Sequence, residues 1–283
     1  NIHGDETTGI GIVHNLIRCL PEILIQGAVH LYPTLNPGGL SGATRMLPDD
    51  GQDLNRMFPG KARGPASSRH AHCVWMDIIS RQPSVLLDLH TDVTGSIPYA
   101  IMDRVLDMRM RRKLSGACQR LATSSGLTVL REYTRDRYMR FHLDRSLPGA
   151  MVNQQHIPAV TLEVGPRNRL DPDAIAIGTS AALGVMTEVG VVNVPAPDHP
   201  SRQEGGPWRR ESGPRTNHTG VLVPRVRPGD ALERGRVMAE VRTIRGEILE
   251  TLSARAGGFV VALTDRTHVV PGVSCATIGV RDR

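Results

Sequence analysis

The 283-residue sequence predicts an α/β fold followed by a smaller all-β module. Helix-like and strand-like segments alternate as far as about residue 193, which is typical of a sheet with helices on its faces. Two short apolar runs, SVLLDL at 84–89 and AVTLEV at 159–164, have the composition of buried parallel strands. After residue 193 the pattern changes to short strands separated by turn signals.

Taken in order, the first element is a helix at 8–20, where apolar residues recur at helical spacing and Pro21 is expected to end it. A short extended run, AVHLYPTL, follows at 28–35. Residues 36–66 are rich in Gly, Pro and Asp and predict a long ordered loop, a kind of segment that is often functional. Further helices are expected at 69–80, 105–126 and 171–189.

These patterns divide the chain into three parts. Residues 1–194 are expected to form a catalytic α/β domain. Residues 195–217 are rich in Pro, Gly and Arg and predict a linker. Residues 218–283 predict an all-β domain of about seventy residues that carries no catalytic group of its own.

Composition narrows the class of protein. Hydrophobic residues make up 40% of the chain and charged residues 22%, as in a globular protein. No apolar run approaches the roughly 18 residues that span a bilayer, and no signal-peptide pattern is visible. The four cysteines are far apart and form no C-x-x-C pair. We therefore expect reduced thiols, a cytoplasmic location and no membrane partner.

The net charge of +6 and the pI of about 9.6 raise the question of nucleic-acid binding. The densest basic cluster spans residues 109–113, in a helix-like stretch. No aromatic residues alternate with these charges, so a stacking platform for bases is missing. We interpret the cluster as a solvated helix face and expect no nucleic-acid partner.

Chemistry-bearing side chains gather at three predicted strand ends. His90 directly follows SVLLDL, Glu163 lies near the end of AVTLEV, and His3 and Glu6 stand just before the first helix. Ligands in α/β sheets bind at the carboxyl ends of strands. His3, Glu6 and His90 form a two-histidine, one-carboxylate set, the ligand type of a catalytic zinc with one position open for water.

The remaining carboxylate and the long loop supply the other groups that such a site needs. Glu163 is the candidate that takes a proton from water and passes it to the leaving nitrogen. Arg45 and Arg56 offer two guanidinium groups, one for a developing oxyanion and one for a substrate carboxylate. Asn55 can donate to the same carboxylate.

Five motifs, in this order, resemble the succinylglutamate desuccinylase/aspartoacylase family of zinc carboxypeptidase-like enzymes: H-G-D-E, N-P-G-G, D-L-N-R-M-F-P-G, D-L-H-T and L-E-V-G. The resemblance covers residues 1 to about 190. It implies a mixed sheet flanked by helices and a smaller C-terminal domain of barrel-sandwich type. That module has no lysine, so it carries no lipoyl or biotinyl group. The family places a hydrophobic strand just before H-G-D-E, and this sequence begins at Asn1 without one.

The resemblance also implies roles for the site residues. It implies one Zn²⁺ per chain, with Glu163 as the general base and Arg45 as the arginine that polarises the carbonyl. The zinc ligands would be His3, Glu6 and His90, and the pair that binds a substrate carboxylate would be Asn55 and Arg56.

The expected activity is that of a zinc-dependent amidohydrolase that removes an acyl group from a small N-acyl amino acid. Within the family, the loop motifs look closest to bacterial deacylases of the N-acetyl-diaminobutyrate deacetylase type. Two alternatives stay open: a zinc carboxypeptidase acting on peptide C-termini, and a metal-free binding homologue without catalytic activity. The oligomeric state, a homo-oligomer included, stays open as well.

Overall fold

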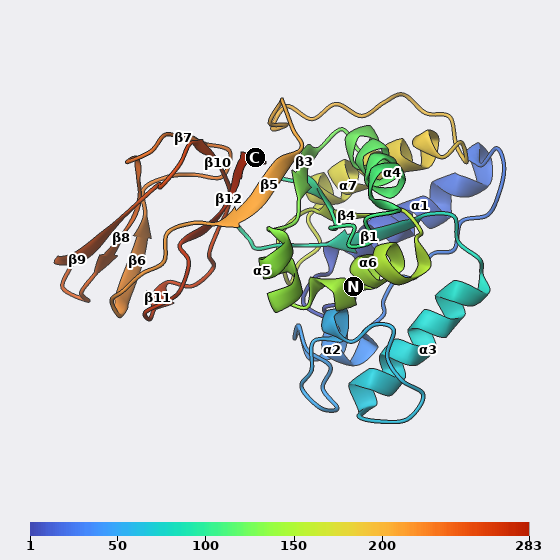
Figure 1. The fold of residues 1–283 in the computed structure, drawn as a ribbon, viewed down its shortest axis with the longest axis horizontal. Helices are drawn as coiled ribbons and strands as arrows, with labels where there is room; N and C mark the ends of the chain where they lie inside the picture. The colour runs from blue at the N-terminus through green and yellow to red at the C-terminus, as the bar shows by residue number, and fades with distance from the viewer. Residues whose placement is uncertain (283) are drawn as a thin grey trace.

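A computed structural model describes residues 1–282 of the chain (Figure 1). Its helices are α1 (Thr8–Ile23), α2 (Pro37–Ser41), α3 (Ala66–Ser80), α4 (Arg111–Ser124), α5 (Arg135–Arg140), α6 (Leu147–Ala150) and α7 (Pro172–Glu188), with single turns η1 (Leu54–Arg56), η2 (Leu143–Arg145) and η3 (Met151–Gln155). Its strands are β1 (Leu86–His90), β2 (Tyr99–Met102), β3 (Thr128–Arg131), β4 (Ala159–Glu163), β5 (Trp208–Ser212), β6 (Gly220–Pro224), β7 (Ala231–Leu232), β8 (Val237–Arg242), β9 (Ile248–Ser253), β10 (Gly258–Leu263), β11 (His268–Val269) and β12 (Ala276–Arg281).

The strands form an eight-stranded mixed sheet in the order β1-β4-β2-β3-β5-β12-β10-β7 and a four-stranded antiparallel sheet in the order β11-β6-β8-β9. In the larger sheet β1 and β4 are parallel, whereas β2 runs antiparallel to β4. Helices α1, α4 and α7 pack together on one face of this sheet, and η2 and α6 lie over the other. The predicted fold class, a mixed α/β sheet flanked by helices with a smaller C-terminal all-β part, is confirmed.

Several element boundaries differ from those expected. Helix α1 continues past Pro21 to Ile23. Proline has no N–H, so one helical hydrogen bond is lost at Pro21, but the next turn still closes, with the Leu24 N–H donating to the Leu20 carbonyl at 2.9 Å. The run 28–35 forms no strand. Helix α4 begins only at Arg111, and not at residue 105 as expected. The backbone before it is bonded to a side chain instead, because the Leu106 N–H donates to the side-chain oxygen of Asn153.

The segment expected to be a linker contains strand β5. Trp208 of β5 pairs with Leu130 of β3 on one side and with Arg281 of β12 on the other. Hydrogen bonds therefore run without interruption from the α/β part of the sheet into the C-terminal strands (Figure 1). The division of the chain at residues 194 and 218 stays a prediction.

The C-terminal strands enclose a core of their own. Buried side chains from both sheets meet there, among them Met238, Val241, Val260 and Ile278. The core of the α/β part is larger and draws on α1, α3, α4, α7 and the first four strands. With few aromatic residues in the sequence, aliphatic side chains make up most of both clusters.

Strand β1 lies at one edge of the large sheet, and among residues 1–282 it pairs only with β4. Beside it lies a cavity of about 410 Å³, lined mainly by apolar side chains. The cavity separates β1 from the extended run that includes Val29 and Leu31, and Asn1 borders it. This edge of the sheet therefore leaves strand hydrogen-bonding groups and apolar side chains uncovered. None of the described helices has the length and hydropathy that crossing a membrane requires.

Candidate metal centre and pocket

The first residues of the chain are held by the side chain of Asn1. Its amide nitrogen donates to the carbonyl oxygens of His3, Gly4 and Glu6 at 3.0–3.1 Å. Its amide oxygen accepts from the Thr34 hydroxyl at 2.6 Å. These bonds close the chain into a tight turn before α1, and the turn places the side chains of His3 and Glu6 side by side.

A second contact fixes this turn against the long loop. A Cβ atom at Gly4 would lie 1.9 Å from the carbonyl carbon of Gly39, so only glycine allows the two backbones to approach. Asn36 caps α2 by accepting from the Gly39 N–H at 2.8 Å and donates to the Ile2 carbonyl. The H-G-D-E and N-P-G-G motifs thus meet in space, although 29 residues lie between them in the sequence.

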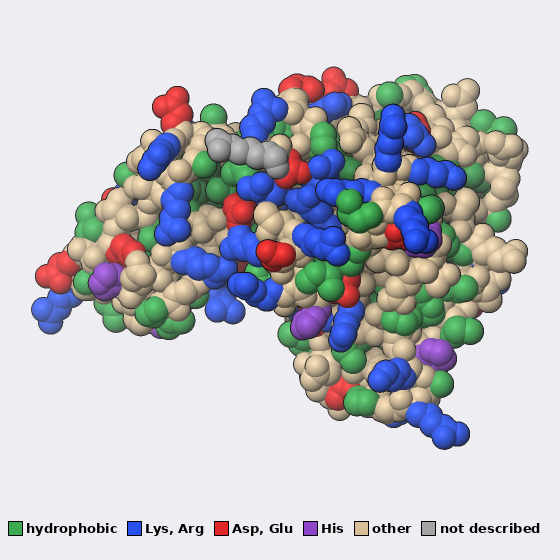
Figure 2. All heavy atoms as spheres, viewed as in Figure 1, with side chains coloured by type: hydrophobic (Ala, Val, Ile, Leu, Met, Phe, Trp, Pro, Cys, Tyr) green, Lys and Arg blue, Asp and Glu red, His purple; other side chains and the backbone are tan. Residues whose placement is uncertain are grey.

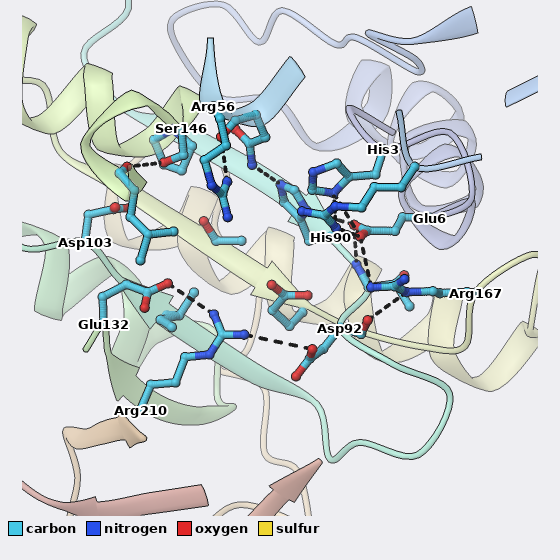
Figure 3. A pocket seen from close by; sticks show the side chains of 18 residues that line it. His3, Glu6, Arg56, His90, Asp92, Asp103, Glu132, Ser146, Arg167 and Arg210 are labelled. Carbon is cyan, nitrogen blue, oxygen red and sulfur yellow. Dashed lines mark hydrogen bonds and ion pairs between the residues drawn. The ribbon is translucent and has the colours of Figure 1, made fainter. Parts of the chain in front are cut away.

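His3, Glu6 and His90 come together as the sequence predicts (Figure 3). All three are buried, and one ligand atom from each lies within 4.8 Å of the others. The Nδ1 atoms of His3 and His90 lie 2.9 and 2.8 Å from the two oxygens of Glu6. Because both imidazoles turn the same nitrogen toward one carboxylate, the donor set fits a metal ion with two nitrogen ligands and one oxygen ligand.

Each histidine also contacts a second carboxylate through its other ring nitrogen. Nε2 of His3 lies 3.1 Å from Asp53, and Nε2 of His90 lies 2.9 Å from Asp88. Carboxylates in this position fix the tautomer and orientation of metal-ligating histidines. The presence of both is an independent reason to interpret the cluster as a metal site.

The electrostatics of the cluster keep its carboxylates ionised. Burial raises the pKa of Glu6, but the neighbouring His3 and His90 outweigh it and bring that pKa well below its usual range. Burial also raises the pKa of Asp88, but the neighbouring His90 outweighs it, so the pKa of Asp88 lies below its usual value. Burial lowers the pKa of His90, yet Asp88 and Glu6 raise it well above its usual value. A cation held here is thus favoured by three converging carboxylates.

Glu163 lies beside the triad. It is buried at the end of β4, and its Oε2 receives no hydrogen bond from any described residue. Burial, reinforced by the charges of Asp92 and Glu6, raises its pKa to about 8. A carboxyl group with a pKa near neutrality can both accept and donate a proton.

The three loop residues that the sequence singled out all line the same pocket. Arg45 ion-pairs with Glu6 at 3.1 Å and Asp53 at 3.0 Å. Asn55 is buried, with its side-chain oxygen accepting from the Leu147 N–H at 2.7 Å and its Nδ2 3.3 Å from Nε2 of His90.

Arg56 differs from Arg45 in that it has no carboxylate within salt-bridge distance among residues 1–282. Its guanidinium donates to the Asn55 carbonyl at 2.6 Å and is partly buried, and burial lowers its pKa. An unpaired guanidinium that lines a pocket is suited to an anionic group of a ligand.

The pocket extends from the triad across the face of the sheet to the ends of β2 and β3. Asp103 and Glu132, which follow these strands, line its far end (Figure 3). Arg210 of β5 contacts Glu132 at 3.2 Å and lies 3.9 Å from Asp92. Arg167, just after the L-E-V-G motif, lies 3.7 Å from Glu6.

Sequence reasoning did not find Asp53, Asp88, Asp103, Glu132, Arg167 and Arg210. Asp53 and Asp88 stand inside motifs already recognised, so the need of ligating histidines for a second partner could have indicated them. Asp103 and Glu132 directly follow β2 and β3, two four-residue strands that the sequence pattern does not predict. Arg210 had no such signal, because its segment has the composition of a linker.

Basic side chains gather on the face of the molecule shown in Figure 2, around the junction between β3 and β5. Several are neutralised within the fold. Asp282 ion-pairs with Arg131 at 2.7 Å and lies within 4 Å of Arg104 and Arg209. Arg137 also pairs with Glu211. These contacts give a structural role to charges that otherwise look like a binding patch.

Comparison with known proteins agrees with the geometry. Residues 1–189 match the model of the succinylglutamate desuccinylase/aspartoacylase catalytic domain. N-alpha-acetyl-L-2,4-diaminobutyric acid deacetylase from Halomonas elongata is 29% identical over 246 residues, which are 84% of this chain and 68% of that protein.

Solved structures share the fold. A succinylglutamate desuccinylase/aspartoacylase from Rhodobacter sphaeroides has a TM-score of 0.78 at 24% identity, covering 99% of this chain and 84% of that one. The product-bound ectoine utilization protein EutE (DoeB) from Ruegeria pomeroyi has a TM-score of 0.81 at 18% identity, covering 99% and 83%.

This fold and the buried His-Glu-His cluster define a member of a deacylase family with a candidate metal site. The chain belongs to the succinylglutamate desuccinylase/aspartoacylase family. The family resemblance inferred from the sequence motifs is thereby confirmed. The individual roles of the site residues stay predictions.

Proposed function

We propose that this protein is a zinc-dependent amidohydrolase that removes the acyl group from a small N-acyl amino acid. The observation that carries the proposal is the buried cluster of His3, Glu6 and His90, with the unpaired carboxyl group of Glu163 next to it. The similarity to N-alpha-acetyl-L-2,4-diaminobutyric acid deacetylase supports an acylated amino acid as substrate.

In this proposal His3, Glu6 and His90 hold the zinc ion, with Asp53 and Asp88 fixing the two imidazoles. When bound, the ion supplies an activated water molecule and polarises the amide carbonyl. Glu163 accepts a proton from that water and then delivers it to the leaving nitrogen. Burial raises the pKa of Glu163 to about 8, and the positive charge of a bound ion would lower it towards the ionised form that a base needs.

In this proposal Arg56 and Arg45 stabilise different negative charges. Arg56, which lacks a carboxylate partner in the described chain, binds the α-carboxylate of the substrate, with Asn55 beside it. Arg45 stabilises the negative charge that develops on the carbonyl oxygen. To do so it turns from Glu6, whose charge the metal ion then neutralises, while Asp53 continues to hold its other nitrogens.

The size of the pocket favours a small substrate over a peptide. Its volume is about 100 Å³, well below the roughly 300–1,000 Å³ of sites for drug-sized ligands. Residues from η2, α6 and β5 close it on several sides. This enclosure supports an N-acyl amino acid rather than the end of a polypeptide.

Two measurements on the purified protein test the proposal. Elemental analysis is expected to find about one zinc per chain, lost in His90→Ala. Release of free amino acid from N-acetyl amino acids is expected, with no cleavage of peptides that lack an N-terminal acyl group. A folded protein that retains zinc and cleaves only peptide C-termini would identify a carboxypeptidase instead. A folded protein that binds no zinc would favour a non-catalytic homologue.

A further inference from the structure

A further cavity lies outside the metal centre, beside the ends of β2 and β3 and the start of α4. Its volume is about 420 Å³, within the roughly 300–1,000 Å³ of sites that hold small molecules. Among the described residues, Asp103 alone lines both this cavity and the pocket at the triad. The function proposed above therefore gives the cavity no role.

The chain topology places the cavity where α/β sheets bind ligands. Strands β2 and β3 are parallel, with Met102 opposite Arg131 at their carboxyl ends, and α4 connects the two strands. In such units ligands bind beyond the carboxyl ends of the strands, next to the segment that leads into the connecting helix. Here that segment contributes Arg104, Val105 and Met108 to the cavity wall.

The wall is strongly basic. Asp282 ion-pairs with Arg131 at 2.7 Å and lies 3.7 Å from Arg104. Arg111 and Arg112 have no carboxylate within 4.0 Å among residues 1–282. Asp282 and the wall residue Asp103 therefore offset at most two of the positive charges around the cavity, which four guanidinium groups supply: Arg104, Arg111, Arg112 and Arg131.

Hydrogen bonds hold the wall in place. Nε of Arg104 donates to the carbonyl oxygens of Glu132 and Tyr133 at 2.9 and 2.7 Å. The side chain of Asn153 donates to the Arg104 carbonyl at 3.0 Å and accepts from the Leu106 N–H at 2.8 Å. The segment between β2 and α4 is thus ordered by side chains, so a ligand would meet a preformed cavity.

The positive charges around the cavity destabilise one another. Burial lowers the pKa of Arg104, Asp282 raises it, and Arg131 and Arg209 lower it further. The first turn of α4 adds two cations, Arg111 and Arg112, and no acidic side chain. A helix begins with a partial positive charge of its own. An anion bound among these groups would reduce their repulsion.

We propose that this cavity binds a small polyanion, a compound that carries two or more phosphate or carboxylate groups. Guanidinium groups bind both kinds of group through paired N–H donors. The positive charge that Asp103 and Asp282 leave uncompensated calls for more than one negative charge on the ligand. No aromatic side chain lines the cavity in the described chain, so stacking of bases is not favoured. The inference does not depend on the deacylase function.

Calorimetry on the purified protein tests the site with two probes, fructose 1,6-bisphosphate and tricarballylate, at low ionic strength. At least one is expected to bind with a Kd below about 1 mM, roughly 10-fold or more tighter than inorganic phosphate. Arg112→Gln, an exposed change that folding should tolerate, is expected to weaken this binding by roughly 10- to 100-fold. Lys113→Gln removes the same charge from the next residue, which does not line the cavity, and should weaken binding no more than about threefold.

The two probes distinguish the sources of the anionic groups. Binding of the bisphosphate alone supports a phosphorylated ligand, and binding of tricarballylate alone supports a polycarboxylate. Equal weakening by Arg112→Gln and Lys113→Gln would show attraction to net charge rather than to the cavity, and would overturn the site.

Two other results would overturn it as well. One is binding of neither probe. The other is binding that Arg56→Gln abolishes and Arg112→Gln leaves unchanged, because the anion would then lie in the pocket at the triad. Binding is measured without turnover, so a protein that cleaves no N-acyl amino acid would refute the proposed function and leave this test intact.

Discussion

His90 and Glu163 stand directly opposite each other, in register, at the carboxyl ends of the parallel strands β1 and β4. The bond from the Val164 N–H to the His90 carbonyl, 2.9 Å long, continues the ladder past them. Paired residues on parallel strands project to the same face of the sheet, with strands about 4.8 Å apart. A metal ligand and the proposed base are therefore positioned by two adjacent, hydrogen-bonded strands of the large sheet.

Replacement of Glu163 by Gln is expected to abolish most activity without loss of zinc. The amide keeps the shape of the side chain but cannot accept the proton, so kcat should fall by about 10²- to 10⁴-fold. Steady-state kinetics and zinc analysis of the same preparation check this. Glu188→Gln, an exposed change near the end of α7, should leave both unchanged. A Glu163→Gln variant with wild-type kcat would exclude this residue as the base.

Asp88→Asn should weaken zinc binding through His90. The carboxylate of Asp88 lies next to Nε2 of His90, where it orients the imidazole and makes it more basic. Without this carboxylate, zinc affinity should fall by roughly 10- to 100-fold. Competition with a chromophoric chelator measures the affinity. Asp173→Asn, exposed in the first turn of α7, serves as the control. Equal affinities of the Asp88 and Asp173 variants would argue against a supporting carboxylate.

Gly4→Ala and Gly116→Ala form a matched pair. The first places a Cβ atom 1.9 Å from the Gly39 backbone and should displace the turn that carries His3 and Glu6, with loss of zinc and of thermal stability. The second adds a methyl group inside α4 where nothing lies within 4 Å, and it should raise stability by about 0.5–1 kcal/mol. Thermal unfolding and zinc content report both. Normal zinc content in Gly4→Ala would show that the close approach is dispensable.

Asp103→Asn should stabilise the protein at alkaline pH. Burial, reinforced by Glu132 and Asp88 and opposed by Tyr138 and Arg56, raises the pKa of Asp103 to about 7. Because the folded state prefers the protonated form, the contribution of Asp103 is fully present below about pH 4 and is lost as the pH rises through 7.

Asparagine at position 103 does not ionise, so the variant's advantage should grow to roughly 2–4 kcal/mol at pH 8. Urea unfolding of both proteins at pH 5 and pH 8, in the same zinc state, measures the difference. An advantage that does not change with pH would contradict an elevated pKa.

The parts of the site that the sequence predicted are those carried by local motifs. His3 and Glu6 lie in one turn, and His90 and Glu163 end the two most apolar runs, so short-range pattern was enough to bring them together. The expectation of a long ordered loop at 36–66 did not include α2 and η1, because each is a single turn set by a capping side chain, Asn36 for α2 and Asp53 for η1.

What the sequence could not predict depends on pairing between distant segments. The run 28–35 has strand-like composition but finds no partner strand in the described chain, and composition alone does not show whether a partner exists. Trp208 and its neighbours become a strand because β3 and β12 lie on either side of them. Arg210 enters the pocket by that same pairing, which no periodicity in its own segment indicates.

The position of β5 between β3 and β12 also sets the order in which the pocket can form as the chain is made. The triad uses residues that leave the ribosome early, whereas the strand that carries Arg210 gains its second neighbour only when residues 276–281 have been synthesised. At a synthesis rate of about 5–20 residues per second, roughly 10–40 s pass between the synthesis of His90 and that of residues 276–281. A nascent chain therefore has its metal ligands before it has a finished substrate pocket.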